Sequence, residues 1–302
     1  MRKLGIIGVG HVGAEVAFSV VTQGICDEIV LIDKNQEKAE SEAIELRDMA
    51  SLTAFHTTIH TQDYNELRTA DVIVIAVGQS DLLHEDRMEE LKATSKIIKE
   101  IVPKIVASGF KGIIINITNP CDVITMMIQA ESGFPKDRVF GTGTSLDTAR
   151  MKRVVGEALA INPKSVDGYV LGEHGESQFI AWSTVNVAGT AIQSLPEAKD
   201  FDLPALKDSV RGGGWKILLG KGWTSFGIAT IAAKLTAAVF NDARQVFPLS
   251  VYDEALDVYI GKPALLGKEG IIHSVAMHLK ESETAALEAS AQVISAAYQT
   301  VK

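Results

Sequence analysis

The sequence predicts an α/β fold in which a doubly wound parallel sheet is followed by a mixed α/β unit. In the first half, short β-branched runs alternate with helical patterns, as in parallel strands joined by right-handed helical crossovers. A glycine-rich turn separates the first run from the first helical pattern. Beyond residue 143 the alternation stops, and helical patterns are mixed with runs typical of antiparallel strands. We therefore predict two domains, residues 1–143 and 144–302.

Near-continuous apolar runs in the first half predict strands buried on both faces of the sheet. These runs are KLGIIG (3–8), EIVLID (28–33), DVIVIAVG (71–78) and GIIINIT (112–118), with helical patterns over 11–24 and 85–109. The second half predicts helices over 146–159, 224–242 and 281–301, and antiparallel strands in FIAWSTVNVAG (179–189), PLSVYD (248–253) and DVYIGKPALLGKEGI (257–271).

Composition and charge narrow the class of protein. A hydrophobic fraction of 46% with 22% charged residues is typical of a soluble globular protein. The formal net charge of −9, with no basic stripe, argues against nucleic acid as a partner. The two cysteines, Cys26 and Cys121, are too few for a disulfide framework or a zinc cluster. Because we find neither a signal peptide nor a membrane-spanning run, we expect a cytoplasmic protein without a membrane contact. Since two cysteines cannot form a zinc cluster, we also expect no metal.

Residues 8–13, GVGHVG, match the G-x-G-x-x-G pattern and lie between a predicted strand and a predicted helix. Gly8 permits the tight turn, Gly10 lets a pyrophosphate approach the backbone, and Gly13 allows the helix to contact the strand. N–H groups at the start of the helix then face the phosphates. Asp33 ends the second strand, 20 residues beyond Gly13, where a carboxylate accepts hydrogen bonds from a ribose and repels a 2′-phosphate. We therefore predict a Rossmann domain that binds NAD rather than NADP.

Further polar motifs mark the region where chemistry is expected. Asn119 follows the fourth apolar run in ITNPCDV, and Asp147 and Arg150 lie one helical turn apart in GTSLDTAR. His174 follows a strand-like run in LGEHGESQF, and Arg87 ends the segment DLLHEDR. Each residue alone also has a structural explanation: an Asn-Pro turn, a helix cap, a solvated ion pair, or a histidine in a glycine turn. Taken singly, these residues leave both explanations open.

In this order, the motifs resemble the L-lactate/malate dehydrogenase family along nearly the whole chain. GTGTSLDTARM (141–151) and GYVLGEHGESQFIAWSTV (168–185) are most similar to its L-2-hydroxyisocaproate dehydrogenase branch. The resemblance implies an NAD-dependent L-2-hydroxyacid dehydrogenase, which transfers hydride reversibly between NADH and 2-oxo acids with medium or large apolar side chains. An L-lactate dehydrogenase that uses pyruvate is the alternative.

The resemblance also assigns roles to single residues. It implies that His174 is the acid and base, and that Asp147 accepts its other ring N–H and favours imidazolium. Arg150 would bind the substrate carboxylate through two parallel hydrogen bonds, and Arg87 would polarise the carbonyl. Asn119 and Thr224 would contact the substrate, and the Asn119–Pro120 bond would be cis. The implied cofactor contacts are Gly8, Gly10, His11, Val12, Gly13, Asp33, Val77, Gly78 and Asn119.

Two departures from the lactate enzymes concern the substrate pocket. Counting back from Arg87, the position that separates lactate from malate enzymes falls on Asp81, whose charge would repel the second carboxylate of oxaloacetate. Gly213 and Gly214 in RGGGW (211–215) replace the alanines usual in lactate enzymes. The loss of two methyl groups from a pocket wall would enlarge the pocket. Alternatively, three consecutive glycines end a helix.

Two further classes share a dinucleotide-binding domain. An NAD-dependent glycosidase would need a metal held by cysteine and histidine, for which Cys121 and His174 are the candidates. A non-enzymatic NAD sensor would need neither His174 nor the two arginines. The presence of Arg87 and of the LDTAR helix favours the dehydrogenase. We expect a small 2-oxo or 2-hydroxy acid as its partner and a homo-oligomer, with a tetramer favoured over a dimer.

Overall fold

The computed structural model describes residues 2–78 and 87–302, and for residues 87 and 88 it describes the backbone alone. Within these residues, one nine-stranded sheet has the strand order β14-β13-β12-β6-β5-β4-β1-β2-β3. The strands are β1 (Lys3–Ile7), β2 (Glu28–Ile32), β3 (Thr58–Thr61), β4 (Val72–Ile75), β5 (Ile113–Asn116), β6 (Val139–Gly141), β12 (Gln245–Asp253), β13 (Val258–Gly267) and β14 (Gly270–Ser274). The part from β3 to β6 is parallel, and an antiparallel β12–β14 meander extends it at β6.

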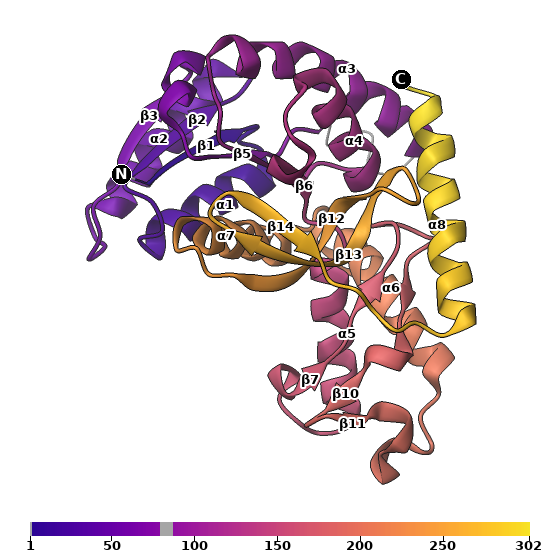
Figure 1. Ribbon diagram of the computed structural model, residues 1–302. Coiled ribbons are helices and arrows are strands. Elements are labelled where there is room, and N and C mark those ends of the chain that lie inside the picture. Colours follow the sequence, from indigo (N-terminus) through magenta and orange to yellow (C-terminus); the bar gives the residue numbers. More distant parts are fainter. Residues whose placement is uncertain (1, 79–86) are drawn as a thin grey trace.

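Helices cover both faces of this sheet (Figure 1). One face carries α1 (His11–Thr22), α2 (Gln36–Ala50) and α7 (Phe226–Phe240), and the other carries α3 (Arg87–Ala107), α4 (Cys121–Ser132) and α8 (Glu281–Gln299). Coverage of both faces explains why the strands read as continuous apolar runs, since every residue of β1 is buried.

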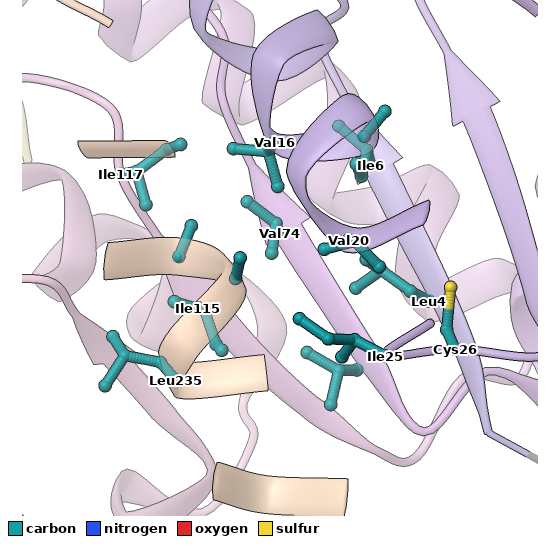
Figure 2. Packing of buried hydrophobic residues seen from close by; sticks show 14 of the residues in the cluster. Leu4, Ile6, Val16, Val20, Ile25, Cys26, Val74, Ile115, Ile117 and Leu235 are labelled. Carbon is teal, nitrogen blue, oxygen red and sulfur yellow. The ribbon is translucent and has the colours of Figure 1, made fainter. Parts of the chain in front are cut away.

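The core lies between the sheet and these helices. Figure 2 shows Val16 and Val20 of α1 packed over Leu4 and Val74 of the sheet, next to Leu235 of α7. Burial of each such side chain stabilises the fold by about 1.5–3 kcal/mol. Because α7 belongs to the second half of the sequence, this core joins the two halves of the chain.

A smaller unit lies below the sheet in the view of Figure 1. It contains α5 (Ser145–Ala158), α6 (Leu203–Lys221) and the short strands β7 (Val166–Asp167), β8 (Val170–Leu171), β9 (Phe179–Ile180), β10 (Asn186–Val187) and β11 (Thr190–Ala191). The smaller unit also has the 3-10 helices η4 (Pro163–Ser165), η5 (Trp182–Thr184), η6 (Ile192–Ser194) and η7 (Pro196–Ala198), whereas η1 (Tyr64–Thr69) and η3 (Lys136–Arg138) lie beside the large sheet. A separate apolar cluster around Met151, Val155 and Val166 holds this unit together.

The predicted fold class is confirmed, with corrections to single elements. The run 179–189 is not one strand, because η5 separates β9 from β10. At this turn the backbone N–H of Ser183 donates to Glu283 Oε1 (3.0 Å) instead of to a strand. The three glycines at 212–214 do not end a helix, since α6 continues through them to Lys221.

Among the described residues, no single helix is long and apolar enough to cross a membrane. The pair α6 and α7 would pass that test jointly, but it is bent by 118°.

Candidate active site

The glycine turn between β1 and α1 has the shape that a dinucleotide requires. Gly8 has a φ of +93°, and a Cβ atom there would lie 2.5 Å from the carbonyl oxygen of Ala76. A Cβ atom on Gly13 would lie 1.9 Å from the carbonyl oxygen of Gly8. At Gly10, by contrast, a Cβ atom would meet nothing within 4 Å. The turn is therefore closed toward the sheet and open at the position that a pyrophosphate would approach.

Asp33 is held beside this turn. Its Oδ2 accepts the backbone N–H of Val9 (2.8 Å) and its Oδ1 accepts that of Asn35 (2.9 Å). Gln62 bonds to both backbone groups of Asp33, at 2.9 and 2.8 Å. A carboxylate oxygen has two lone pairs, so each oxygen keeps acceptor capacity for a ribose hydroxyl. The turn and Asp33 thus fit NAD.

The other predicted cofactor residues lie around the same turn. Val12 lines the large cavity described below, whereas the His11 ring stacks on the indole of Trp223 with centroids 4.0 Å apart. Val77 and Gly78 follow β4, the strand next to β1. Direct contact of these residues with NAD stays a prediction.

Next to the turn lies a cavity of about 490 Å³. It brings together residues that the sequence places far apart: Asn119, Asp147, Arg150, His174, Gly214 and Thr224 all line it. They come from the segment before α4, from α5, from the loop between β8 and β9, from α6 and from the segment before α7. Gly213 lies in the adjoining wall, where its Cβ position is 3.6 Å from Arg150 Cδ.

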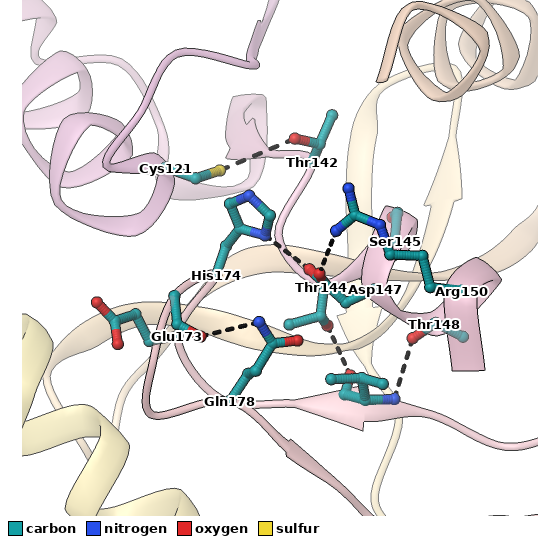
Figure 3. A network of polar contacts seen from close by, with 12 residues as sticks. Cys121, Thr142, Thr144, Ser145, Asp147, Thr148, Arg150, Glu173, His174 and Gln178 are labelled. Atoms are coloured by element: carbon teal, nitrogen blue, oxygen red, sulfur yellow. Dashed lines mark hydrogen bonds and ion pairs between the residues drawn. The ribbon is translucent and has the colours of Figure 1, made fainter. Parts of the chain in front are cut away.

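Asp147 stands at the centre of a charged cluster (Figure 3). Its Oδ2 lies 2.6 Å from His174 Nδ1, and its Oδ1 accepts a hydrogen bond from Arg150 Nη1 (2.8 Å). The Asp147 side chain is 1% exposed, whereas that of His174 is 25% exposed and within reach of a ligand in the cavity. In Figure 3 the other terminal nitrogen of Arg150 points away from Asp147.

Buried hydroxyl groups fix the first turn of α5, which carries Asp147. Thr144 Oγ1 donates to the carbonyl of Val170 (2.6 Å), and Thr148 Oγ1 accepts the N–H of Val170 (3.0 Å). Ser145 Oγ donates to the carbonyl of Pro248 (2.7 Å). The helix start is thereby attached to β8 and β12, so Asp147 has little freedom to move.

The loop that carries His174 is tied to its surroundings as well. Gly172 exchanges two backbone hydrogen bonds with Gly261 of β13 (3.1 and 2.9 Å). The backbone N–H of Glu173 donates to Ser290 Oγ of α8 (2.7 Å). The imidazole is therefore positioned from both sides, by its backbone and by its ring.

The electrostatics of the cluster favour a protonated histidine. Burial lowers the pKa of His174, but the Asp147 carboxylate outweighs burial and raises the pKa above its usual value. Burial raises the pKa of Asp147, but the nearby His174 and Arg150 hold it below its usual range. The arrangement can therefore deliver a proton from imidazolium while Asp147 stays ionised.

Sequence reasoning missed Asp122, which is 1% exposed. Its Oδ2 accepts the backbone N–H of His174 (2.7 Å), and its Oδ1 accepts the hydroxyl of Ser250 (2.5 Å). Burial raises the pKa of Asp122 to about 6. The available signal was its position two residues after the Asn-Pro pair. The apolar lining residues Leu146, Trp215, Leu218 and Ile228 were missed too, since nothing in their local sequence distinguishes them from core or surface residues.

Two predicted residues cannot be placed. Asp81 lies outside the described residues, and so does the side chain of Arg87, whose backbone begins α3. The expected cis bond between Asn119 and Pro120 is confirmed.

Cys121 does not suit a metal site with His174. Its Sγ lies 3.9 Å from Thr142 Oγ1, and burial raises the pKa of the thiol to about 12. A thiol must lose its proton to bind a metal, so this environment opposes the glycosidase alternative.

Elsewhere, Glu28, His60 and Glu66 have side-chain atoms close enough to share a cation. The ammonium of Lys3 already lies there, 3.2 Å from Glu28 and 2.5 Å from Glu66.

Both halves of the chain are similar to domains of one known protein family. Residues 2–141 match the lactate/malate dehydrogenase NAD-binding domain, and residues 144–302 match the lactate/malate dehydrogenase alpha/beta C-terminal domain. The chain is 37% identical to L-lactate dehydrogenase 3 of Bacillus cereus, over 99% of this chain and 98% of the relative. It is 39% identical to L-lactate dehydrogenase of Fusobacterium nucleatum, over 97% and 95%.

Solved structures agree with these matches. MGS-M5, a lactate dehydrogenase enzyme from a Medee basin deep-sea metagenome library, superimposes with a TM-score of 0.95 at 36% identity, over 100% of this chain and 99% of that one. The minor L-lactate dehydrogenase of Enterococcus mundtii also gives a TM-score of 0.95, at 33% identity, over 100% and 98%.

Proposed function

Because this chain belongs to the lactate/malate dehydrogenase family of NAD-dependent 2-hydroxyacid oxidoreductases, we propose that it interconverts pyruvate and L-lactate. The relatives above support this substrate pair through their names. They give no support to the hydroxyisocaproate branch that the sequence motifs favoured. The observation that carries the proposal is the cluster of His174, Asp147 and Arg150 in one cavity beside the glycine turn.

NAD is the cofactor, and in its reduced form it supplies the hydride. The residues of the chain supply the proton and the binding of the acid. Since His174 Nδ1 faces Asp147, the other ring nitrogen, Nε2, is the one that gives a proton to the developing alkoxide. The guanidinium of Arg150 binds the substrate carboxylate through hydrogen bonds that a point charge does not reproduce. We assign the polarisation of the carbonyl to Arg87 on the strength of its place in the motif.

A preference for larger side chains is the second candidate function. Gly213 and Gly214 face Arg150, with the Cβ position of Gly214 3.4 Å from Arg150 Nη2. The wall beside the carboxylate-binding group therefore lacks two methyl groups that alanines would place there. A 2-oxoisocaproate side chain is three carbons longer than that of pyruvate, which is worth about 2.4 kcal/mol at roughly 0.8 kcal/mol per buried CH₂.

The oxidation of NADH at 340 nm with a panel of 2-oxo acids tests both candidates. We expect turnover of pyruvate, and little turnover of oxaloacetate if Asp81 faces the substrate. A kcat/KM that rises about 50-fold from pyruvate to 2-oxoisocaproate would favour the second candidate, because about 1.4 kcal/mol corresponds to tenfold. Activity that persists with EDTA would set aside the glycosidase alternative. An absence of turnover with every acid would contradict both candidates.

We also propose a cytoplasmic homo-oligomer, with a tetramer favoured over a dimer. Exposed apolar side chains on neighbouring helices support a contact between copies: Phe18 on α1, Ile44 on α2, Phe226 on α7, and Leu52 and Phe55 after α2. The cytoplasm fits the two buried, unpaired cysteines. Size-exclusion chromatography with light scattering measures the assembly, and a mass of 32.4 kDa, that of one chain, would contradict it.

A further inference from the structure

His174 is held by two buried carboxylates, and the proposed function uses one of them. Asp147 contacts the ring, whereas Asp122 accepts the backbone N–H of the same residue (2.7 Å). Both aspartate side chains are 1% exposed. A buried carboxylate without a structural or electrostatic task is costly, since burial penalises its charged form.

Asp122 also joins three elements around the site. It stands in the first turn of α4, three residues after Asn119, and the hydroxyl of Ser250 in β12 donates to its Oδ1 (2.5 Å). Its Oδ2 bonds to the loop between β8 and β9. The segment with Asn119 and the loop with His174 come from different halves of the chain. The hydrogen bond from the His174 N–H to the Asp122 carboxylate connects them directly. The positive end of the α4 macrodipole favours a negative charge at this position.

We propose, on the basis of the proposed function, that Asp122 is a positioning residue that holds the backbone of His174 in register with Asn119 and adds a second negative charge beside the imidazolium. Small displacements matter in such a site, because a shift of about 1 Å can lower a rate about 100-fold. Among the described side chains, the charged groups that act on the His174 ring are Asp147 and Arg150 from α5 and Asp122 from α4, while Glu173 precedes it in its own loop.

The test compares Asp122→Asn and Asp122→Ala with a matched control, Thr125→Val. Thr125 is one turn along α4 and fully buried, and its hydroxyl donates to the carbonyl of Cys121 (2.7 Å) without contact to His174. We expect Asp122→Ala to lower kcat for reduction about 10- to 100-fold. KM should change less than about threefold, because Arg150 is untouched. Thr125→Val should lower the melting temperature and keep kcat.

A second readout does not depend on activity. NMR titration of His174, assigned by comparison with His174→Gln, should give a lower pKa in Asp122→Asn than in Thr125→Val, because one neighbouring negative charge is gone. This distinguishes the two hypotheses: a wild type that reduces no 2-oxo acid contradicts the proposed function, whereas an unchanged His174 pKa contradicts the role of Asp122.

A merely structural Asp122 would give lower melting temperatures with kcat per folded enzyme and the His174 pKa both unchanged, and this result would overturn the inference. If neither Asp122 variant folds, Ser250→Ala decides, since it removes one of the bonds that hold the carboxylate. We then expect a fall in kcat of about two- to fivefold. A kcat equal to that of the wild type would reject the positioning role.

Discussion

The floor of the cavity and its outer wall are built in opposite ways. On the floor, Asp147 lines the cavity, and Asp122 supports it from behind through the backbone of His174. Both aspartates are buried, and each of their carboxylate oxygens has a hydrogen-bond partner. The outer wall is helix α6. Of the described residues in this helix, one, Val210, is buried. Trp215 and Leu219 of the same helix are 45% and 80% exposed. The groups that we propose for proton transfer are therefore fixed by many contacts, whereas the α6 side of the cavity is packed lightly.

This difference suggests that the reaction and the substrate preference depend on different parts of the cavity. A change on the floor removes a partner from a buried charge, which affects every substrate alike. A change on α6 alters the shape of the cavity and leaves the cluster of Asp147, His174 and Arg150 in place. We therefore expect that substitutions in α6 can change the substrate preference while the reaction stays the same.

The largest effect is expected from Asp147→Asn, which tests the floor. Loss of the carboxylate removes the charge that raises the pKa of His174 and the acceptor that orients its ring. We expect kcat for reduction to fall between about 10² and 10⁴-fold.

The pH profile of the same variant provides a separate check. Reduction needs imidazolium, so wild-type kcat/KM should fall as the pH rises through the raised pKa of His174. In Asp147→Asn this fall should move to lower pH, because the charge that favoured imidazolium is gone. A profile that stays in place would show that Asp147 does not control the proton of His174.

Arg150→Lys should have the next largest effect, and it acts on binding. Lysine keeps the positive charge but loses the fork that binds a carboxylate through two bonds. A hydrogen bond to a charged group contributes about 1.5–3 kcal/mol, so KM for the 2-oxo acid should rise about 10- to 100-fold, with a smaller change in kcat. Arg153→Lys is the matched control, because Arg153 is an exposed residue of the same helix that pairs with Glu157. Equal KM values in the two variants would refute the proposal that Arg150 binds the substrate carboxylate through two hydrogen bonds.

The double substitution Gly213→Ala and Gly214→Ala tests the wall. The new methyl groups would lie 3.6 and 3.4 Å from Arg150 atoms, which is ordinary contact, so the fold should tolerate them. We expect the ratio of kcat/KM for 2-oxoisocaproate to that for pyruvate to fall about tenfold, since two methyl groups correspond to about 1.6 kcal/mol. Gly212→Ala is the control, because a Cβ atom there meets nothing within 4 Å. An unchanged ratio would show that this wall does not contact the substrate side chain.

The sequence predicted the residues that line the floor of the cavity better than the contacts that hold them in place. Strands and helices were predictable from local periodicity, and the pairing of Asp147 with His174 from the family motifs. Asp122 bonds to a residue 52 positions away, and β12 joins the sheet through one residue pair, Ser250 and Gly141. Such contacts depend on how whole elements pack, and no local pattern encodes them. The continuity of α6 through its glycines was hard to predict for the opposite reason, because helix propensity favours a break that tertiary structure overrides.

The smallest expected effects are changes in the free energy of unfolding, when glycine is replaced by alanine once in each region. Gly212→Ala on the wall adds a methyl group where there is open space, so the gain in helix propensity should raise the free energy of unfolding by about 0.5–1 kcal/mol. Gly261→Ala beneath the floor places Cβ 2.5 Å from the carbonyl oxygen of Gly172, whose backbone pairing holds the His174 loop. Such overpacking should lower the free energy of unfolding by about 1–3 kcal/mol. Urea unfolding of both variants measures these differences, and the opposite signs are the expected result. A destabilised Gly212→Ala would mean that α6 is as tightly packed as the floor, and the contrast between the two regions would fail.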